Sequence, residues 1–341
     1  MKIILDAMGG DNAPHEILKG AAAAVASFWP ELEVIAVGDA DAIAAAAKEM
    51  NLGLEHIEIV HAPEVISMCD EPAKAVRQKK NSSMVVGLQM LAEGKGDAFV
   101  SAGSTGALHV GTSLIVRTIK GVKRPALATV IPGVSPFLLL DCGANVECRP
   151  AMLEAFGVMG SVYMEKVMGV AKPRVALVNN GAEETKGTPT YVEAHALLKA
   201  NPSIHFVGNV EPRDIPAGVA DVVVADGFTG NVVLKLTEGL AKYFGGKIKE
   251  LFKSGLGGNM AYLLVKNGVS EFKKSMDADE YGGAPFLGAA KPVIKAHGSS
   301  NARAIHQAIR QAKLCVENDL CGVMAKNLAT DKEEGEKPCI S

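Results

Sequence analysis

Short apolar runs alternate with longer segments of helical periodicity along almost the whole chain of 341 residues. A short run bounded by turn residues predicts a buried strand, and a three-to-four-residue apolar spacing predicts a helix. Repeated alternation of this kind is typical of βαβ units. The sequence therefore predicts a three-layer α/β/α fold around a mainly parallel sheet. The predicted strands are residues 3–5, 34–37, 57–60, 98–100, 127–131, 138–140, 175–178, 205–207 and 222–224, and the predicted helices include 14–27, 40–50, 84–93, 152–168, 189–198 and 302–320.

The chain shows no repeat of fixed period and no linker that divides it cleanly. We therefore expect a single domain over residues 1–323. The last residues are charged and lack periodicity, which predicts a flexible C-terminal tail over residues 324–341.

Charge and hydropathy exclude several functional classes. The chain has 35 basic and 38 acidic residues and a net charge of -3, so the overall positive charge of a nucleic-acid-binding protein is missing. The apolar run at the N-terminus is too short for a signal peptide, and no stretch approaches the roughly 20 apolar residues that span a bilayer. The histidines form no metal-ligand motif. These features predict a cytoplasmic protein without a metal site, whose membrane contact, if any, is peripheral.

One predicted helix carries a long apolar stripe. Between residues 232 and 252 the apolar side chains recur every three or four positions, and a glycine-rich turn and a second short apolar segment follow. This pattern predicts a helical hairpin over about residues 232–275 that protrudes from the domain. The lysines and glutamates around its tip give a local charge of +4. Such a tip suits an anionic membrane surface, and a dimer interface explains it equally well. The apolar tip residues are Leu256, Met260, Tyr262, Leu263, Leu264 and Val265.

Six polar, mostly glycine-rich loops follow predicted strands or precede predicted helices, where ligands bind in open α/β sheets. They are named here in chain order, from the first loop to the sixth loop. Their residues are 6–14, 101–107, 140–147, 179–189, 226–231 and 297–301.

The second and fifth loops have the composition of anion sites. The second loop offers Ser104, Thr105 and Gly106 at a predicted helix start, where unpaired backbone N–H groups suit a phosphate. In the fifth loop, Thr229 is the expected helix cap and Gly230 relieves crowding at the same kind of helix start.

The other loops each have a structural and a functional interpretation. Gly9 and Gly10 permit either a tight turn or a close approach to a ligand. Asp141 and Asn145 either cap a turn or orient neighbouring groups. His297 is either a general base or a hydrogen-bonded loop histidine. No loop matches the motif of nucleoside triphosphate sites, dinucleotide sites or serine hydrolases.

Taken together, five of these loops resemble those of the phosphate acyltransferases of bacterial phospholipid synthesis. The resemblance extends from residue 1 to about 323. It rests on Leu5-Asp6-Ala7-Met8-Gly9-Gly10-Asp11, Ser101-Ala102-Gly103-Ser104-Thr105-Gly106-Ala107, Leu140-Asp141-Cys142-Gly143-Ala144-Asn145-Val146, Ala225-Asp226-Gly227-Phe228-Thr229-Gly230-Asn231 and His297-Gly298-Ser299-Ser300.

The resemblance implies transfer of a long-chain acyl group from acyl carrier protein to inorganic phosphate, without a cofactor. It also implies a fold like that of phosphate acetyltransferases and isocitrate or isopropylmalate dehydrogenases. Members of the family are typically homodimers that associate with the inner face of the plasma membrane, where a glycerol-3-phosphate acyltransferase uses the acyl phosphate.

For individual residues, the resemblance implies Lys186 and Asn231 as the catalytic pair. The phosphate ligands would be Ser104, Thr105, Gly106, Gly9, Gly10, Thr229 and Gly230. Supporting roles would fall to Asp6, Asp141, Asn145, Asp226, His297 and Ser299, with Asp226 orienting Lys186 or its own loop. Two positions depart from the family: Ser104 stands where Asn is more common, and Cys142 occupies a position not associated with cysteine.

Two other functions stay open at this stage. The first is a phosphate acetyl- or butyryltransferase that uses coenzyme A, which shares the phosphate chemistry. The second is a membrane-surface scaffold that binds acyl carrier protein without catalysis. The number of polar loops argues against the scaffold, because binding alone does not need them.

Overall fold

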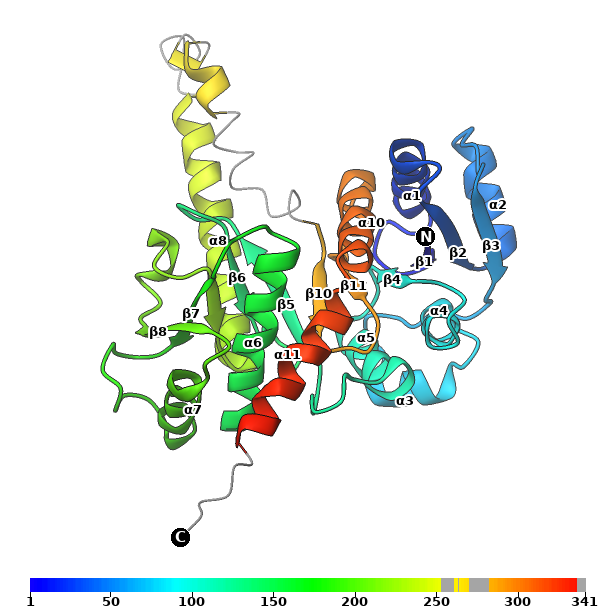
Figure 1. Ribbon diagram of the computed structural model, residues 1–341. Coiled ribbons are helices and arrows are strands. Elements are labelled where there is room, and N and C mark those ends of the chain that lie inside the picture. Colours follow the sequence, from blue (N-terminus) through cyan, green and yellow to red (C-terminus); the bar gives the residue numbers. More distant parts are fainter. Residues whose placement is uncertain (253–260, 263, 270–281, 336–341) are drawn as a thin grey trace.

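The computed structural model of the protein describes residues 1–252, 261–262, 264–269 and 282–335, with the side chains of the last helix described as far as Ala329 (Figure 1). The described strands form one sheet of 11 strands in the order β3-β2-β1-β4-β11-β10-β5-β6-β9-β7-β8. Their bounds are β1 (Lys2–Asp6), β2 (Glu33–Gly38), β3 (Ile57–His61), β4 (Ala98–Ser101), β5 (Ala126–Ile131), β6 (Phe137–Leu140), β7 (Arg174–Val178), β8 (His205–Val210), β9 (Val222–Val224), β10 (Ala284–Leu287) and β11 (Val293–Lys295).

All nine strands predicted from the sequence are present, and two more lie near the C-terminus. The missed strands, β10 and β11, occupy the centre of the sheet between β4 and β5. They are only four and three residues long, and Pro285 in β10 and Pro292 directly before β11 argue against central strands in the sequence.

The sheet contains two parallel groups that run in opposite directions. Strands β3, β2, β1, β4 and β11 are parallel, and so are β6, β9, β7 and β8. Between them, β10 pairs antiparallel with both β11 and β5, and β5 pairs antiparallel with β6. The prediction of a mainly parallel sheet is thus confirmed within each group, but the loops of the two groups leave the sheet in opposite senses.

Helices cover both faces of the sheet because alternate strand residues point to opposite sides. Ile3 and Leu5 belong to one hydrophobic cluster and Ile4 to the other. The first cluster includes residues of α1, α2, α6, α7, α10 and α11, and the second includes residues of α3, α4 and α5. The helix bounds are α1 (His15–Phe28), α2 (Ala40–Glu49), α3 (Pro72–Gln78), α4 (Ser83–Ala92), α5 (Thr105–Gly111), α6 (Pro150–Lys166), α7 (Pro189–Ala200), α8 (Gly227–Phe252), α10 (Ala302–Glu317) and α11 (Leu320–Gly335).

The predicted tail begins too early. Residues from Leu320 to Gly335 form helix α11, in which Met324 is buried and Leu328 is 9% exposed. This helix packs on α6, so Met324 and Leu328 belong to the core rather than to a flexible tail. The sequence missed the helix because its apolar residues are few and its second half is charged. Residues 336–341 lie outside the described part.

Helix α8 is the longest described helix and begins earlier than predicted, at Gly227 rather than near residue 232. Its second half projects beyond the sheet in Figure 1. The hairpin as a whole stays a prediction, because residues 253–260 and 270–281 lie outside the described part. Of the predicted tip, Leu264 is 88% exposed, and Tyr262 and Val265 are also exposed. Leu256, Met260 and Leu263 lie outside the described residues.

Among the described residues, no helix is both long and apolar enough to cross a bilayer.

Candidate active site

The first and second loops are joined through a buried carboxylate at the end of β1. Asp6 is 1% exposed, and its Oδ2 accepts a 2.7 Å hydrogen bond from Ser101 Oγ at the end of β4. Ser101 Oγ in turn accepts the N–H of Gly103. Burial raises the pKa of Asp6, while its hydrogen bonds oppose that shift. Asp6 therefore links the first and second loops through Ser101 and does not face solvent.

Gly9 and Gly10 are required by the packing of these loops. A side-chain carbon at Gly9 would lie 2.7 Å from the backbone nitrogen of Gly103. Gly10 has a φ of +101°, and a side-chain carbon there would lie 2.9 Å from the carbonyl oxygen of Gly298. The first loop thus contacts both the second and the sixth loop at backbone distance.

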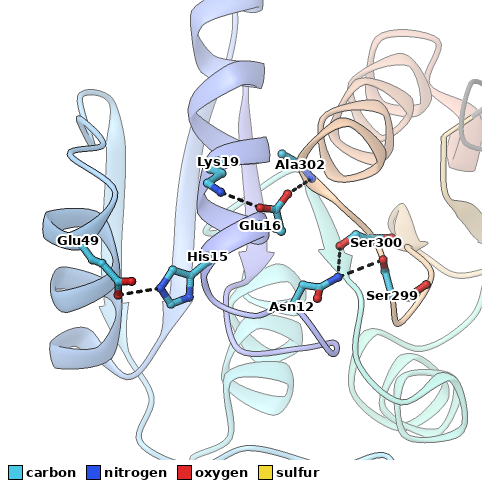
Figure 2. Close-up of polar contacts among 8 residues, drawn as sticks. All are labelled: Asn12, His15, Glu16, Lys19, Glu49, Ser299, Ser300 and Ala302. Carbon is cyan, nitrogen blue, oxygen red and sulfur yellow. Dashed lines mark hydrogen bonds and ion pairs between the residues drawn. The ribbon is translucent and has the colours of Figure 1, made fainter.

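The first and sixth loops are hydrogen-bonded to each other (Figure 2). Asn12 Nδ2 donates to the carbonyl oxygens of Ser299 and Ser300, each at 3.2 Å. The N–H of Asp11 donates to Gly298 O at 2.8 Å. Three loops that are far apart in sequence therefore form one unit at the ends of β1, β4 and β11, which we call the phosphate-side cluster.

His297 is exposed on this cluster and is held by its own loop. Its Nδ1 accepts the N–H of Ser299 and lies 2.8 Å from Ser299 Oγ. Because Nδ1 accepts an N–H, the proton of a neutral ring sits on Nε2, which can donate a hydrogen bond outward. The geometry supports the interpretation of His297 as a hydrogen-bonded loop histidine, with Ser299 as its partner.

The second loop keeps free backbone donors. Ser104 caps α5, since its Oγ accepts the N–H of Ala107, and it is 7% exposed. Among the described residues, the N–H groups of Thr105 and Gly106 donate no hydrogen bond. Gly106 is exposed and Thr105 half-buried. An anion at this helix start would meet unpaired donors.

The fifth loop differs from the open anion site expected from the sequence. Asp226, not Thr229, caps α8, because its Oδ1 accepts the N–H of Thr229 at 2.7 Å. The N–H of Gly227 donates to Asn145 O, and that of Gly230 donates to Asp226 O. The N–H groups of Thr229 and Gly230 therefore already have protein partners, and phosphate binding by these two residues stays a prediction.

Asp226 orients its own loop rather than Lys186. Its Oδ2 accepts a 2.8 Å hydrogen bond from the phenol of Tyr191 on α7. Burial raises the pKa of Tyr191 to about 12, so the phenol stays protonated and acts as a donor. This second hydrogen bond fixes the carboxylate that begins α8.

The third loop is built around Asp141, which is fully buried. Its carboxylate accepts the N–H groups of Leu127, Gly143, Ala144 and Asn145, and Asn145 Nδ2 adds a further bond at 2.7 Å. Burial nevertheless raises the pKa of Asp141. Asp141 and Asn145 thus orient the third loop, and Asn145 O holds the start of α8 through Gly227.

Asn231 and Lys186 reach solvent from these loops. Asn231 is exposed in the first turn of α8, and its side chain lies over Gly143. Lys186 is exposed in the fourth loop, whose backbone is held by Asn179 Nδ2 to Lys186 O and by Asn209 Nδ2 to Glu183 O. The neighbouring Gly187 packs against Tyr191. Tyr191 therefore connects the fourth and fifth loops, which with the third form the acyl-side cluster.

A charge interaction relates the two clusters. Lys235, one turn beyond Asn231 on α8, lies close enough to Lys295 at the end of β11 for its positive charge to lower the pKa of Lys295. Lys235 is on the same helix as Asn231, so α8 links the acyl-side cluster electrostatically to the end of β11.

The cysteines near the site are not activated. Cys142 is buried and Cys148 half-buried. Burial raises the pKa of each thiol to about 12. A thiol protonated at neutral pH is a poor nucleophile, so neither residue suits a covalent acyl intermediate.

Sequence reasoning missed Tyr191 and Lys295. The role of Tyr191 could not be predicted, because it lies inside a predicted helix and contacts Asp226, 35 residues away in sequence, only in the folded chain. Lys295 directly follows Val293 and Ile294, a short apolar run just before the sixth loop. Recognition of that run as a strand would have placed Lys295 at a strand end.

Comparison with known proteins decides the family. Residues 1–323 match the family described as "Fatty acid synthesis protein". The phosphate acyltransferase of Caldanaerobacter subterraneus subsp. tengcongensis is 47% identical over 321 residues, covering 94% of this chain and 95% of its own length. This chain belongs to that family. The phosphate acyltransferase of Alkaliphilus oremlandii is 48% identical over 321 residues, with 93% and 94% of the two chains covered. Membership of this family identifies the chain as an acyltransferase.

Solved structures support the fold independently. A phosphotransacetylase from Streptococcus pyogenes superposes with a TM-score of 0.65 at 17% identity, covering 93% of this chain and 94% of its own. The EutD phosphotransacetylase from Staphylococcus aureus gives 0.60 at 19% identity, with 92% and 94% covered. The predicted likeness to phosphate acetyltransferases is thus confirmed for the fold. The likeness to isocitrate or isopropylmalate dehydrogenases stays a prediction.

Proposed function

We propose that the enzyme transfers a long-chain acyl group from acyl carrier protein to inorganic phosphate and so forms an acyl phosphate for phosphatidic acid synthesis. The observation that carries this proposal is the family match over residues 1–323, which includes every loop of both clusters. The free donors of the second loop support a phosphate seat, formed by Ser104, Thr105 and Gly106 with Gly9 and Gly10 beneath. The exposed polar side chains of the acyl-side cluster support a site for the thioester.

In the proposed reaction, a phosphate oxygen attacks the thioester carbonyl carbon, the C–S bond breaks, and the carrier thiolate takes up a proton. Lys186 offsets the charge of phosphate or polarises the carbonyl, and Asn231 donates to the developing oxyanion. Phosphate is itself a nucleophile, so both substrates bind together and no acyl-enzyme forms. The protonated thiols of Cys142 and Cys148 support this direct route.

The test is to incubate the protein with palmitoyl-acyl carrier protein and phosphate and to look for acyl phosphate by mass spectrometry. Acetyl- and butyryl-coenzyme A in parallel reactions test the short-chain alternative, which shares this fold. We expect product from the carrier thioester and intersecting initial-rate lines when both substrates are varied. Turnover of coenzyme A esters alone would favour the alternative, and no turnover would favour a non-catalytic scaffold.

We also propose that α8 pairs two subunits and that the segment beyond it touches an anionic membrane. The first part rests on a stripe of apolar side chains that are exposed in a single subunit, between about half and two thirds of their surface. They are Val232, Leu236, Leu240, Tyr243, Phe244 and Leu251. The second part rests on Leu264, which is 88% exposed, and on the positive charge around it. Contact with the inner face of the plasma membrane would deliver acyl phosphate to a glycerol-3-phosphate acyltransferase.

Replacing both Leu264 and Val265 with Glu is expected to remove most of the protein from the floating fraction in a liposome flotation assay with anionic vesicles. The change inserts two charges where apolar side chains would enter the interface. Soluble turnover should be unaffected, because both residues lie beyond α8. Val134→Glu, at an 83% exposed apolar position between β5 and β6, is the matched control and should still float. A folded double variant that floats like the wild type would contradict the lipid contact. A change in sedimentation instead would assign these residues to the dimer.

A further inference from the structure

Lys295 is a buried lysine at the centre of the phosphate-side cluster. It is the last residue of β11 and pairs with Ser101 in β4. Only 7% of its surface is exposed. Its Nζ donates to Ala102 O at 3.2 Å and to Ala296 O. Ala102 belongs to the second loop, and Ala296 directly precedes the sixth. The ammonium group therefore joins the second loop to the end of β11, directly before the sixth loop.

This positive charge has no direct counter-ion. Among the described residues, no carboxylate forms an ion pair with Lys295, in contrast to buried Lys313, which binds Glu31 and Glu317. Burial of an ammonium group without a paired anion costs free energy of desolvation. Hydrogen bonds to two carbonyl oxygens offset that cost only in part. An anionic ligand above the second loop would supply the missing charge.

Burial, more than the surrounding charges, sets the pKa of Lys295. Burial lowers its pKa to about 8, Asp6 on β1 and Asp11 in the first loop raise it, and Lys235 on α8 lowers it. His297, two residues further on, is turned toward Ser299. A bound anion would favour the protonated form, so binding of the anion and protonation of Lys295 are linked.

We propose that Lys295 is a positioning residue for phosphate: its ammonium group holds the second loop against the end of β11, where the sixth loop begins, and provides the buried positive charge that a phosphate dianion needs. Lys295 acts from the opposite cluster to Lys186 and Asn231, so the phosphate lies between two sources of stabilisation. This inference rests on the proposed phosphate seat and deepens it.

The test compares Lys295→Met with Lys313→Met in the full-length protein. Lys295→Met keeps the length of the side chain without its charge, so we expect weaker phosphate binding by about tenfold or more in isothermal titration calorimetry, and a matching rise in the KM for phosphate. The KM for acyl-acyl carrier protein should stay within about twofold of the wild type. Lys313→Met, at a buried lysine in α10, should leave phosphate binding unchanged. Unchanged phosphate affinity in a folded Lys295→Met protein, or an equal rise of both KM values, would overturn the proposal.

A pH series with Lys295→Arg gives a second test, which applies even if Lys295→Met does not fold. In the wild type, 1/KM for phosphate should fall as the pH rises above about 8, because Lys295 then loses its proton. Phosphate is already mainly the dianion in that range, so its own titration contributes little to the fall. Arginine stays protonated, and the fall should disappear in Lys295→Arg. If 1/KM for phosphate still falls above about pH 8 in Lys295→Arg, the proposal is wrong. If the wild type binds phosphate but makes no acyl phosphate, the proposed function fails and the binding role of Lys295 stands.

Discussion

Gly230→Ala is expected to destabilise the protein by about 3 kcal/mol or more and to displace the first turn of α8. A side-chain carbon at Gly230 would lie 1.9 Å from the carbonyl oxygen of Asp141. That oxygen belongs to the backbone, and Asp141 is fixed by its buried hydrogen bonds, so no side-chain rotation can relieve the clash. Urea unfolding followed by circular dichroism measures the loss of stability.

Gly239→Ala is the matched control on the same helix. No atom lies within 4 Å of a side-chain carbon built there, and alanine favours a helix over glycine by about 1 kcal/mol. Gly239→Ala should therefore leave the stability unchanged or raise it slightly. Equal stabilities of the two variants would mean that α8 does not begin against Asp141 as the structure has it.

Asn231→Ala is expected to lower kcat by about a hundredfold or more, since the loss of one oxyanion donor commonly raises the barrier by about 2.7–4 kcal/mol. Asn231 is exposed and its side chain lies over Gly143, so its removal leaves no buried cavity. The folded state should therefore survive, and the substrate KM values should change much less than kcat. Steady-state acyl phosphate formation, with thermal unfolding of the same samples, separates these effects.

Asn231→Asp sharpens this test, because it keeps the shape of the side chain but replaces an amide donor with a negative charge. It should be at least as inactive as Asn231→Ala. Gln89→Ala, which removes an exposed amide from α4, should keep wild-type turnover. Near-normal kcat in Asn231→Ala would remove Asn231 from the proposed mechanism and leave Lys186 as the remaining candidate.

Local hydrophobic patterns were most informative where an element is one continuous apolar run or has a periodic apolar face. Nine strands and most helices were predictable, because buried strands need continuous apolar runs and helices need a periodic apolar face. Strands β10 and β11 escaped prediction because short strands are specified by their neighbours in the sheet. Helix α11 escaped because only a few of its side chains, such as Met324, enter the core.

Within the site, residue types were predictable but their partners were not. The sequence identified Asp226 and Thr229 at a helix start, yet assigned the cap to Thr229. The structure gives the cap to Asp226, because Tyr191 from another helix fixes its carboxylate. Similarly, an isolated glycine loop indicates an anion site, but in the fifth loop the N–H groups of Gly227, Thr229 and Gly230 are already bonded, whereas those of Thr105 and Gly106 are not.

The sequence by itself determined the class of fold, the six polar loops and the resemblance to a family, since each depends on residues close together in the chain. Only the tertiary structure decided which loops meet. The antiparallel strands β10 and β5 reverse the strand direction within the sheet and separate the loops into two clusters, and the charge of Lys235 on α8 acts on Lys295 in the phosphate-side cluster. The environment of Lys295 also depends on the tertiary structure, because burial and the charges of two segments distant in sequence act together only in the folded chain.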